Sequence, residues 1–330
     1  MVLESIIKKK NIRRHPILIF FITLLICFGS IFFADVMFPN QSSILSVAFI
    51  TIGLVPLVYN VLSDEEVDEA STRKNFTTFF ARHFNLIMLF VWIFIGVIVA
   101  FTIYYVVSPP EMRSLLFEEQ IRNFCSISGT GNCAEGIPFS ISKITGQFSG
   151  VAAFNFDACL SDNSTVTSCT WLIFANNFKV LLFTIVLSVL YGVGAIFMIV
   201  WNASILGVFF GELLLMGNLE KAAGLFQGML LGHGPPELLA YVFGALAGAI
   251  LSAMIARGEF LKSEESIIIK DVLFLSALAI FSVAYGAVTE AVGILKMNEL
   301  YFILGVLYLL VIIVAVMLYG KTRSLPHLGF

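Results

Sequence analysis

Long, unbroken apolar runs constrain this chain more than any other feature of its sequence. A helix that crosses a bilayer needs about 20 mostly apolar residues, and lipid leaves no backbone polar group without a partner inside the segment. The 330 residues are 59% hydrophobic and 12% charged, whereas soluble domains are about 25% charged. The sequence therefore predicts an all-α, polytopic transmembrane helix bundle, and its few basic residues argue against nucleic-acid binding.

Eight such runs predict about eight membrane helices. Their approximate limits are 17–38, 44–62, 84–107, 178–200, 203–217, 235–256, 271–294 and 299–319. The fifth run has 15 residues, which is short for a full crossing. It fits either a tilted helix or part of a re-entrant segment near 218–234.

The positions of Lys and Arg predict the orientation, because cytoplasmic loops hold the excess of basic residues. With the N-terminus inside, thirteen of the 19 basic residues lie on the inner side. This orientation predicts a multi-pass protein of the cell membrane with both termini in the cytoplasm and residues 108–170 outside the cytoplasm. If 203–217 did not cross, the basic loop 257–270 would face outward, so we expect this run to cross.

The same boundaries divide the chain into five parts. They are an N-terminal two-helix membrane hairpin with a charged cytoplasmic connector (1–83), a third helix (84–107), an extracytoplasmic cysteine-containing domain (108–170), a core transmembrane bundle (171–296), and a last helix with a cytoplasmic tail (297–330).

Four of the five cysteines, Cys125, Cys133, Cys159 and Cys169, lie in the segment that the charge rule places outside. Oxidising compartments favour disulfides, and the cysteine spacings contain no C-x-x-C pair typical of zinc sites. Three pairings are compatible with the sequence. We expect Cys125–Cys133 and Cys159–Cys169, because both loops are short, and these bonds would staple a small external domain.

Polar residues stand inside or at the ends of helices in the second half of the chain, where lipid makes them costly and functional roles common. They are Asn176, Asn177, Lys179, Glu212, His233, Glu237 and Glu290. The predicted topology places all of them in the outer part of the membrane, so we expect one polar cluster that binds a partner, an ion or a proton. His233, Glu237 and Glu290 are the candidate metal ligands, although a single histidine is a poor metal set; no cofactor is expected.

The string His233-Gly234-Pro235-Pro236-Glu237 also has a purely structural interpretation. Proline is favoured at the first helical position, which makes Gly234 the expected N-cap and Glu237 the third residue. A carboxylate at that position can reach back to the cap N–H and complements the helix dipole. Capping explains Glu237 but not His233, and both interpretations stay open.

Small residues recur at four-residue spacing in two helices, as Gly207 and Gly211 in one and Gly244 and Gly248 in the other. Such spacing lets membrane helices pack closely. The contact is either inside this bundle or in a homo-oligomer.

Several of these motifs, in this order, resemble the stage II sporulation protein M family of integral membrane proteins. They are Asn176-Asn177 before Lys179, Asn202 with Gly207 five residues on, His233-Gly234-Pro235-Pro236-Glu237 running into Gly244-Ala245-Leu246-Ala247-Gly248, and Thr289-Glu290. The resemblance covers about 172–294 and reaches back toward the third helix and the external segment. The first two helices and the cysteine domain look like additions. Ala203 stands where the family usually has glycine.

The resemblance implies a membrane-embedded scaffold, since the family member of spore-forming bacteria recruits peptidoglycan-degrading enzymes. It implies lipid and a membrane or extracytoplasmic protein as partners. A transporter or channel that uses the His/Glu cluster for cations or protons is the alternative. An intramembrane hydrolase is the least favoured, because the sequence has no H-E-x-x-H or G-x-S-x-G motif, and we do not expect an enzyme.

Overall fold

The computed structural model describes residues 17–71, 76–128, 159, 165–217, 219, 223, 226, 231–256, 265–295 and 298–324. Within these ranges every regular element is a helix. Eight helices are long and apolar enough to cross a membrane, judged by length and composition. The predicted all-α bundle of about eight membrane helices is confirmed.

The helices follow one another along the chain with short connections. They are α3 (Ile17–Met37), the 3-10 turn η1 (Pro39–Gln41), α4 (Ser42–Ser71), α5 (Phe76–Val107), α6 (Pro110–Leu116), α7 (Glu118–Ser128), α9 (Val166–Tyr191), α10 (Ala195–Leu215), α12 (Gly234–Ala256), α13 (Glu265–Ile294) and α14 (Asn298–Ser324).

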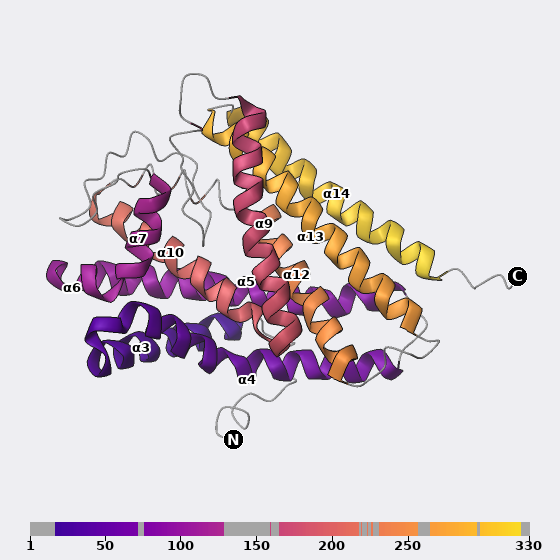
Figure 1. Cartoon of the computed structure of the whole chain (residues 1–330), viewed down its shortest axis with the longest axis horizontal. Coiled ribbons are helices and arrows are strands. Elements are labelled where there is room, and N and C mark those ends of the chain that lie inside the picture. Colours follow the sequence, from indigo (N-terminus) through magenta and orange to yellow (C-terminus); the bar gives the residue numbers. More distant parts are fainter. Residues whose placement is uncertain are drawn as a thin grey trace, which may run out of the picture.

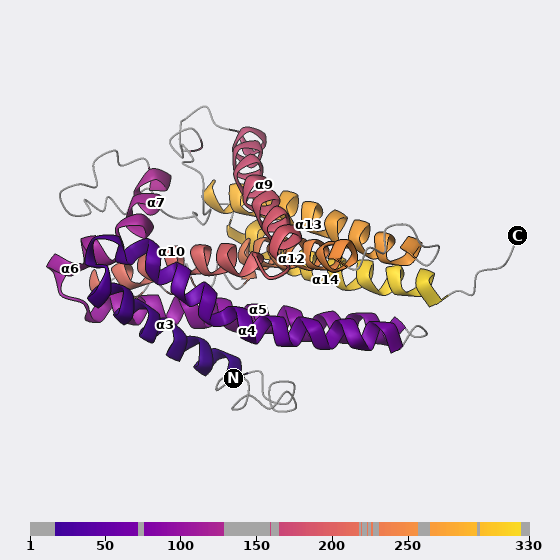
Figure 2. The ribbon, with the colours of Figure 1, turned by 60° about the horizontal axis from the view of Figure 1, so that its bottom comes forward.

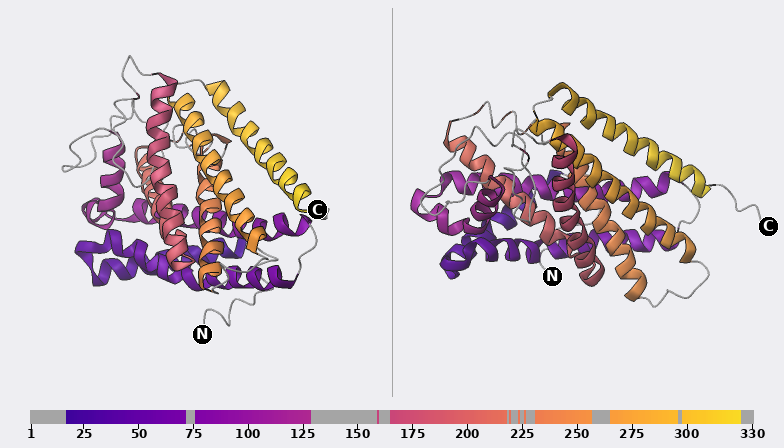
Figure 3. Two further views of the ribbon diagram at one scale, coloured as in Figure 1. Left: turned by 45° about the vertical axis from the view of Figure 1, so that its right-hand side comes forward. Right: turned by 45° about the horizontal axis from the view of Figure 1, so that its top comes forward.

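The long helices form two groups that run across one another (Figure 1). The first contains α3, α4 and α5, with α10 packed along α5. The second contains α9, α12 and α13, with α14 beside α13, and Figure 3 shows these four helices standing over the first group. Helix α10 contacts α5 as well as α9 and α12, so it connects the two groups.

The fourth and fifth helices begin and end earlier than predicted. The expected ranges were 178–200 and 203–217, whereas α9 ends at Tyr191 and α10 begins at Ala195. The break falls at Gly192, whose φ of 67° is left-handed backbone that glycine adopts without strain. The fifth helix therefore has 21 residues, enough to cross. The predicted re-entrant segment near 218–234 lies largely outside the described residues.

The first part of segment 108–170 packs on the membrane helices (Figure 2). The ring of Phe117, between α6 and α7, lies 5.9 Å from that of Phe101 and 5.3 Å from that of Tyr105. Gln120 of α7 is fully buried. Its Oε1 accepts a hydrogen bond from Ser43 Oγ at 2.7 Å, and its Nε2 donates to Ser204 Oγ at 3.3 Å.

The last part of the same segment joins the start of α9. Thr165 caps this helix through its side chain, which accepts a hydrogen bond from the Ser168 N–H. A disulfide links Cys159 to Cys169 in the first turn of α9, with 5.1 Å between their Cα atoms. The predicted Cys125–Cys133 pair lies outside the described residues. Segment 108–170 is thus attached to the helix bundle at both of its ends.

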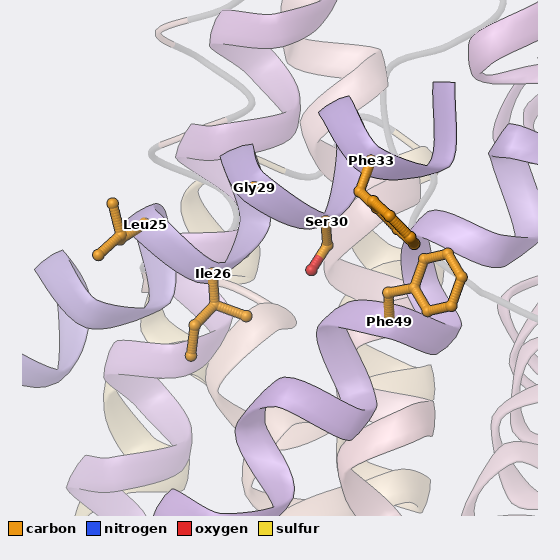
Figure 4. Close-up of a pocket in the computed structure, with 6 residues that line it drawn as sticks. All are labelled: Leu25, Ile26, Gly29, Ser30, Phe33 and Phe49. Carbon is orange, nitrogen blue, oxygen red and sulfur yellow. The ribbon is translucent and has the colours of Figure 1, made fainter. Parts of the chain in front are cut away.

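An apolar hollow of about 400 Å³ opens between α3 and α4. Figure 4 shows its lining, which consists of Leu25, Ile26, Gly29, Ser30, Phe33 and Phe49. None of these side chains is charged, so the hollow matches lipid chains better than a polar ligand.

The predicted pairing of Cys159 with Cys169 can be tested by mass spectrometry of the non-reduced protein. Digestion should release one cross-linked peptide pair joining these residues, and reduction should separate it. Replacing Cys159 with Ser should lower the free energy of unfolding by about 2–3 kcal/mol, because the closed loop is short. A cross-link from Cys159 or Cys169 to another cysteine would contradict the pairing.

Candidate functional site

Two acidic side chains meet in the interior of the second helix group. Glu237 belongs to the first turn of α12 and Glu290 to the last turns of the neighbouring α13. Glu237 is 7% exposed and Glu290 is 1% exposed, and their side chains are hydrogen-bonded to one another. Because antiparallel neighbours bring the start of one helix beside the end of the next, the spacing of the two residues along the chain produces this contact.

A third helix supplies two amides to the acid pair. Asn177 of α9 donates from Nδ2 to Glu237 Oε1 at 2.9 Å. Asn176 donates from Nδ2 to Asn177 Oδ1 at 3.3 Å. Both asparagines are buried inside α9, about three turns from its first residue, whereas the sequence placed them ahead of a helix. We call Asn176, Asn177, Glu237 and Glu290 the acid–amide cluster.

A glycine lets α12 and α13 approach closely at this cluster. A Cβ atom on Gly286 of α13 would lie 3.0 Å from Glu237 Cγ and 3.4 Å from Pro236 Cβ. Real Cβ atoms rarely make such short contacts, so only glycine leaves room for the Glu237 side chain. The predicted capping role therefore does not account for this carboxyl group, which reaches across to two other helices.

His233 lies next to the cluster and is held by the last helix. Its Nδ1 is 2.7 Å from the hydroxyl oxygen of Tyr301 in α14, and both residues are buried. The Tyr301 ring packs on Gly232 and Gly293, where added Cβ atoms would overlap it. Tyr301 thus covers the end of the cluster and fixes the position of His233.

Glu212 belongs to a different polar contact, at the ends of α5 and α10. Its Oε2 accepts a hydrogen bond from the Tyr105 hydroxyl at 2.7 Å. Arg113 of α6 lies 5.5 Å above the centre of the Tyr105 ring and donates to the carbonyl oxygens of Tyr105 and Val106. This contact attaches the external segment to the membrane helices, and it is separate from the hydrogen bonds of the acid–amide cluster.

Lys179 is exposed on the surface of α9, whereas Asn176 and Asn177 on the same helix are buried. The prediction of a single layer containing all seven polar side chains is therefore wrong for Lys179 and Glu212. The reason is helical periodicity, since residues two positions apart point to different sides of a helix.

The predicted packing glycines face neighbouring helices of the same chain. A Cβ on Gly207 or Gly211 of α10 would overlap Phe101 or Tyr105 of α5. A Cβ on Gly244 or Gly248 of α12 would overlap Leu181 or Ser188 of α9. Of the two interpretations that the sequence left open, the structure shows contact inside the bundle.

The metal hypothesis for His233, Glu237 and Glu290 stays a prediction. Among the residues that the structure describes, no three His, Cys, Asp or Glu side chains are grouped so that they could hold a metal ion.

One family model, described as stage II sporulation protein M, matches residues 134–293. Over these residues the chain belongs to the stage II sporulation protein M family. The matched region contains the complete acid–amide cluster, His233 and Glu212. No curated protein and no solved structure matches the chain.

The limits of the family match differ from those expected. The match begins at residue 134, inside the cysteine segment, and so excludes the third helix, to which the resemblance was expected to extend. It includes Cys159 and Cys169, which the sequence had assigned to an addition. The membrane core of the family thus includes this disulfide, and α3 to α7 precede it.

Three residues that the sequence did not single out complete the polar contacts. They are Tyr105, Gln120 and Tyr301, whose partners are described above. Aromatic residues are common in membrane helices, so Tyr105 and Tyr301 give no local signal. Gln120 is the one whose position, in a short amphipathic segment, could have indicated a buried contact.

Paired glycine substitutions test the packing of α12 on α9. Gly248→Ala would place a Cβ 2.6 Å from Ser188 Cβ and 2.8 Å from the Ile185 carbonyl oxygen. We expect this variant to lose about 1–3 kcal/mol of unfolding free energy in detergent, because backbone and core must shift. In the control, Gly29→Ala, the Cβ meets nothing within 4 Å, and we expect equal or higher stability. A change in oligomer size with unchanged stability for Gly248→Ala would place this glycine at an interface between copies.

Proposed function

We propose that the chain is a multi-pass membrane scaffold of the stage II sporulation protein M family that positions a membrane or extracytoplasmic protein partner. The observation that carries the proposal is the attachment of segment 108–170 at both of its ends. Gln120 ties its first part to Ser43 and Ser204, and the Cys159–Cys169 bond ties its last part to α9. A segment held in this way presents a fixed surface to a partner.

The exposed side of α7 is the part of this surface that the structure describes. Arg122 is 62% exposed and pairs with Glu118 and Glu119 on the same helix. Pairs of this kind contribute little to stability, so their charges are available for recognition. The charge distribution of the loops supports an extracytoplasmic position for this segment and cytoplasmic termini. The proposal assigns no catalytic role to the chain.

Charge exchange on α7 tests the scaffold proposal. The triple variant Glu118→Lys, Glu119→Lys and Arg122→Glu keeps the opposite-charge pairs but reverses the pattern that a partner meets. The intact chain, purified from native membranes in mild detergent, should retain a stoichiometric partner, and the triple variant should lose it with unchanged thermal stability. Glu212→Gln serves as the control, because this residue bonds inside the chain. Purification of the intact chain alone, or equal retention by the triple variant, would overturn the proposal.

A second candidate function, transport of protons or cations, is favoured by the buried pair Glu237 and Glu290. Ionisable residues inside a membrane bundle often mark an ion pathway. If the pair serves transport, the chain in proteoliposomes should carry a proton or cation flux that Glu237→Gln and Glu290→Gln abolish. Absence of flux through the intact chain would exclude this function.

A further inference from the structure

The carboxyl groups of Glu237 and Glu290 are hydrogen-bonded to one another although both are acids. An ionised carboxylate can only accept a hydrogen bond, so this contact requires a proton on one of the two groups. The burial of both side chains adds to the requirement, because two negative charges in contact and removed from water repel strongly. The geometry therefore describes two carboxyl groups that share one proton.

The surrounding amides suit a pair that carries one proton and one negative charge. Asn177 directs its N–H group at Glu237 Oε1, so it stabilises the remaining charge. This donation leaves the Asn177 carbonyl oxygen to accept from Asn176. The hydrogen bonds of α9 thus all point toward the acid pair.

A further acceptor beside the pair has no partner among the described residues. Asn176 is 3% exposed, and its Oδ1 makes no hydrogen bond there. The amide lies 3.3 Å from Asn177, next to the acid pair. A buried carbonyl oxygen without a donor is costly, so its position indicates that a donor is received there. A water molecule that carries a proton to or from the pair supplies such a donor.

The other titratable groups that face the pair come from three positions. Tyr241 of α12 and Tyr301 of α14 interact electrostatically with both acids, and His233 is bonded to Tyr301. On α9, the facing residues are the neutral Asn176 and Asn177, while Lys179 is exposed. Glu237 lies in the first turn of α12 and Glu290 one turn before the end of α13, so the pair is near one end of both helices.

We propose that Glu237, Glu290 and Asn176 form a proton-binding site that holds one exchangeable proton and thereby fastens α12 to α13. When the proton leaves at high pH, two carboxylates face one another beside Gly286, and the contact between the helices weakens. The folded chain binds this proton and the denatured chain, with separate solvated carboxylates, does not at neutral pH. Stability due to the pair is therefore present at low pH and is lost as pH rises. The inference is independent of the scaffold function and of whether protons cross the membrane.

The test uses the full chain purified in detergent, without any partner. Infrared spectroscopy should show the stretching band of a protonated carboxyl group, which disappears at alkaline pH. Glu237→Gln and Glu290→Gln should each remove the band, since the amide donates permanently and no proton need be shared. The apparent Tm of the intact chain should fall by a few degrees more than that of either Gln variant as pH rises. The matched control, Glu212→Gln, should keep the band and the pH dependence.

Two results would overturn the site. One is the absence of a protonated carboxyl band in the intact chain. The other is a band and a pH dependence that both Gln variants retain. If the Gln variants are not recovered, Asn177→Ala decides the matter, because it leaves both acids in place and removes the donor to Glu237. A shifted band supports the site, and an unshifted band contradicts it.

Discussion

The close approach of α12 to α9 and α13 is the constraint on which the family core depends. Without glycine at Gly244, Gly248 and Gly286, backbone and side chains on the neighbouring helices would overlap. Helices in lipid gain no hydrophobic energy from association, so close packing and interhelical hydrogen bonds must hold them together. The acid–amide cluster sits where these three helices come nearest, and it supplies such hydrogen bonds. Packing and polar chemistry are therefore parts of one arrangement.

Much of this fold could be predicted from the sequence because lipid imposes simple rules. Unbroken apolar runs predicted every membrane helix, and most limits agree within a few residues. The exception is the boundary between α9 and α10, where the apolar run continues through the break. Hydropathy does not distinguish a turn from a helix when the turn residues Gly192, Val193 and Gly194 are themselves apolar or small. The left-handed backbone at Gly192 is a local property that a window average conceals.

The site was predictable in its members more than in its contacts. Costly polar residues in helices identified Asn177, Glu237 and Glu290 from one sequence alone. Which of them touch depends on rotation about each helix axis, and a helix start misplaced at residue 178 left Lys179 apparently beside the asparagines. Glu212 was assigned to the cluster because topology gives depth along the membrane but not position within its plane. Its partner, Tyr105, lies on a helix for which the sequence gave no reason to expect a polar role.

The packing of α10 on α5 has an evolutionary consequence. Helix α10 lies inside the family match, but the side chains that fill the space over Gly207 and Gly211 come from α5, which precedes it. The backbone carbonyl of Gly207 also accepts a hydrogen bond from Thr102 of α5. Excision of the matched region would leave this glycine face bare and its carbonyl without that donor. The N-terminal helices are thus no detachable accessory, and this lineage's α10 and α5 are expected to have changed in concert.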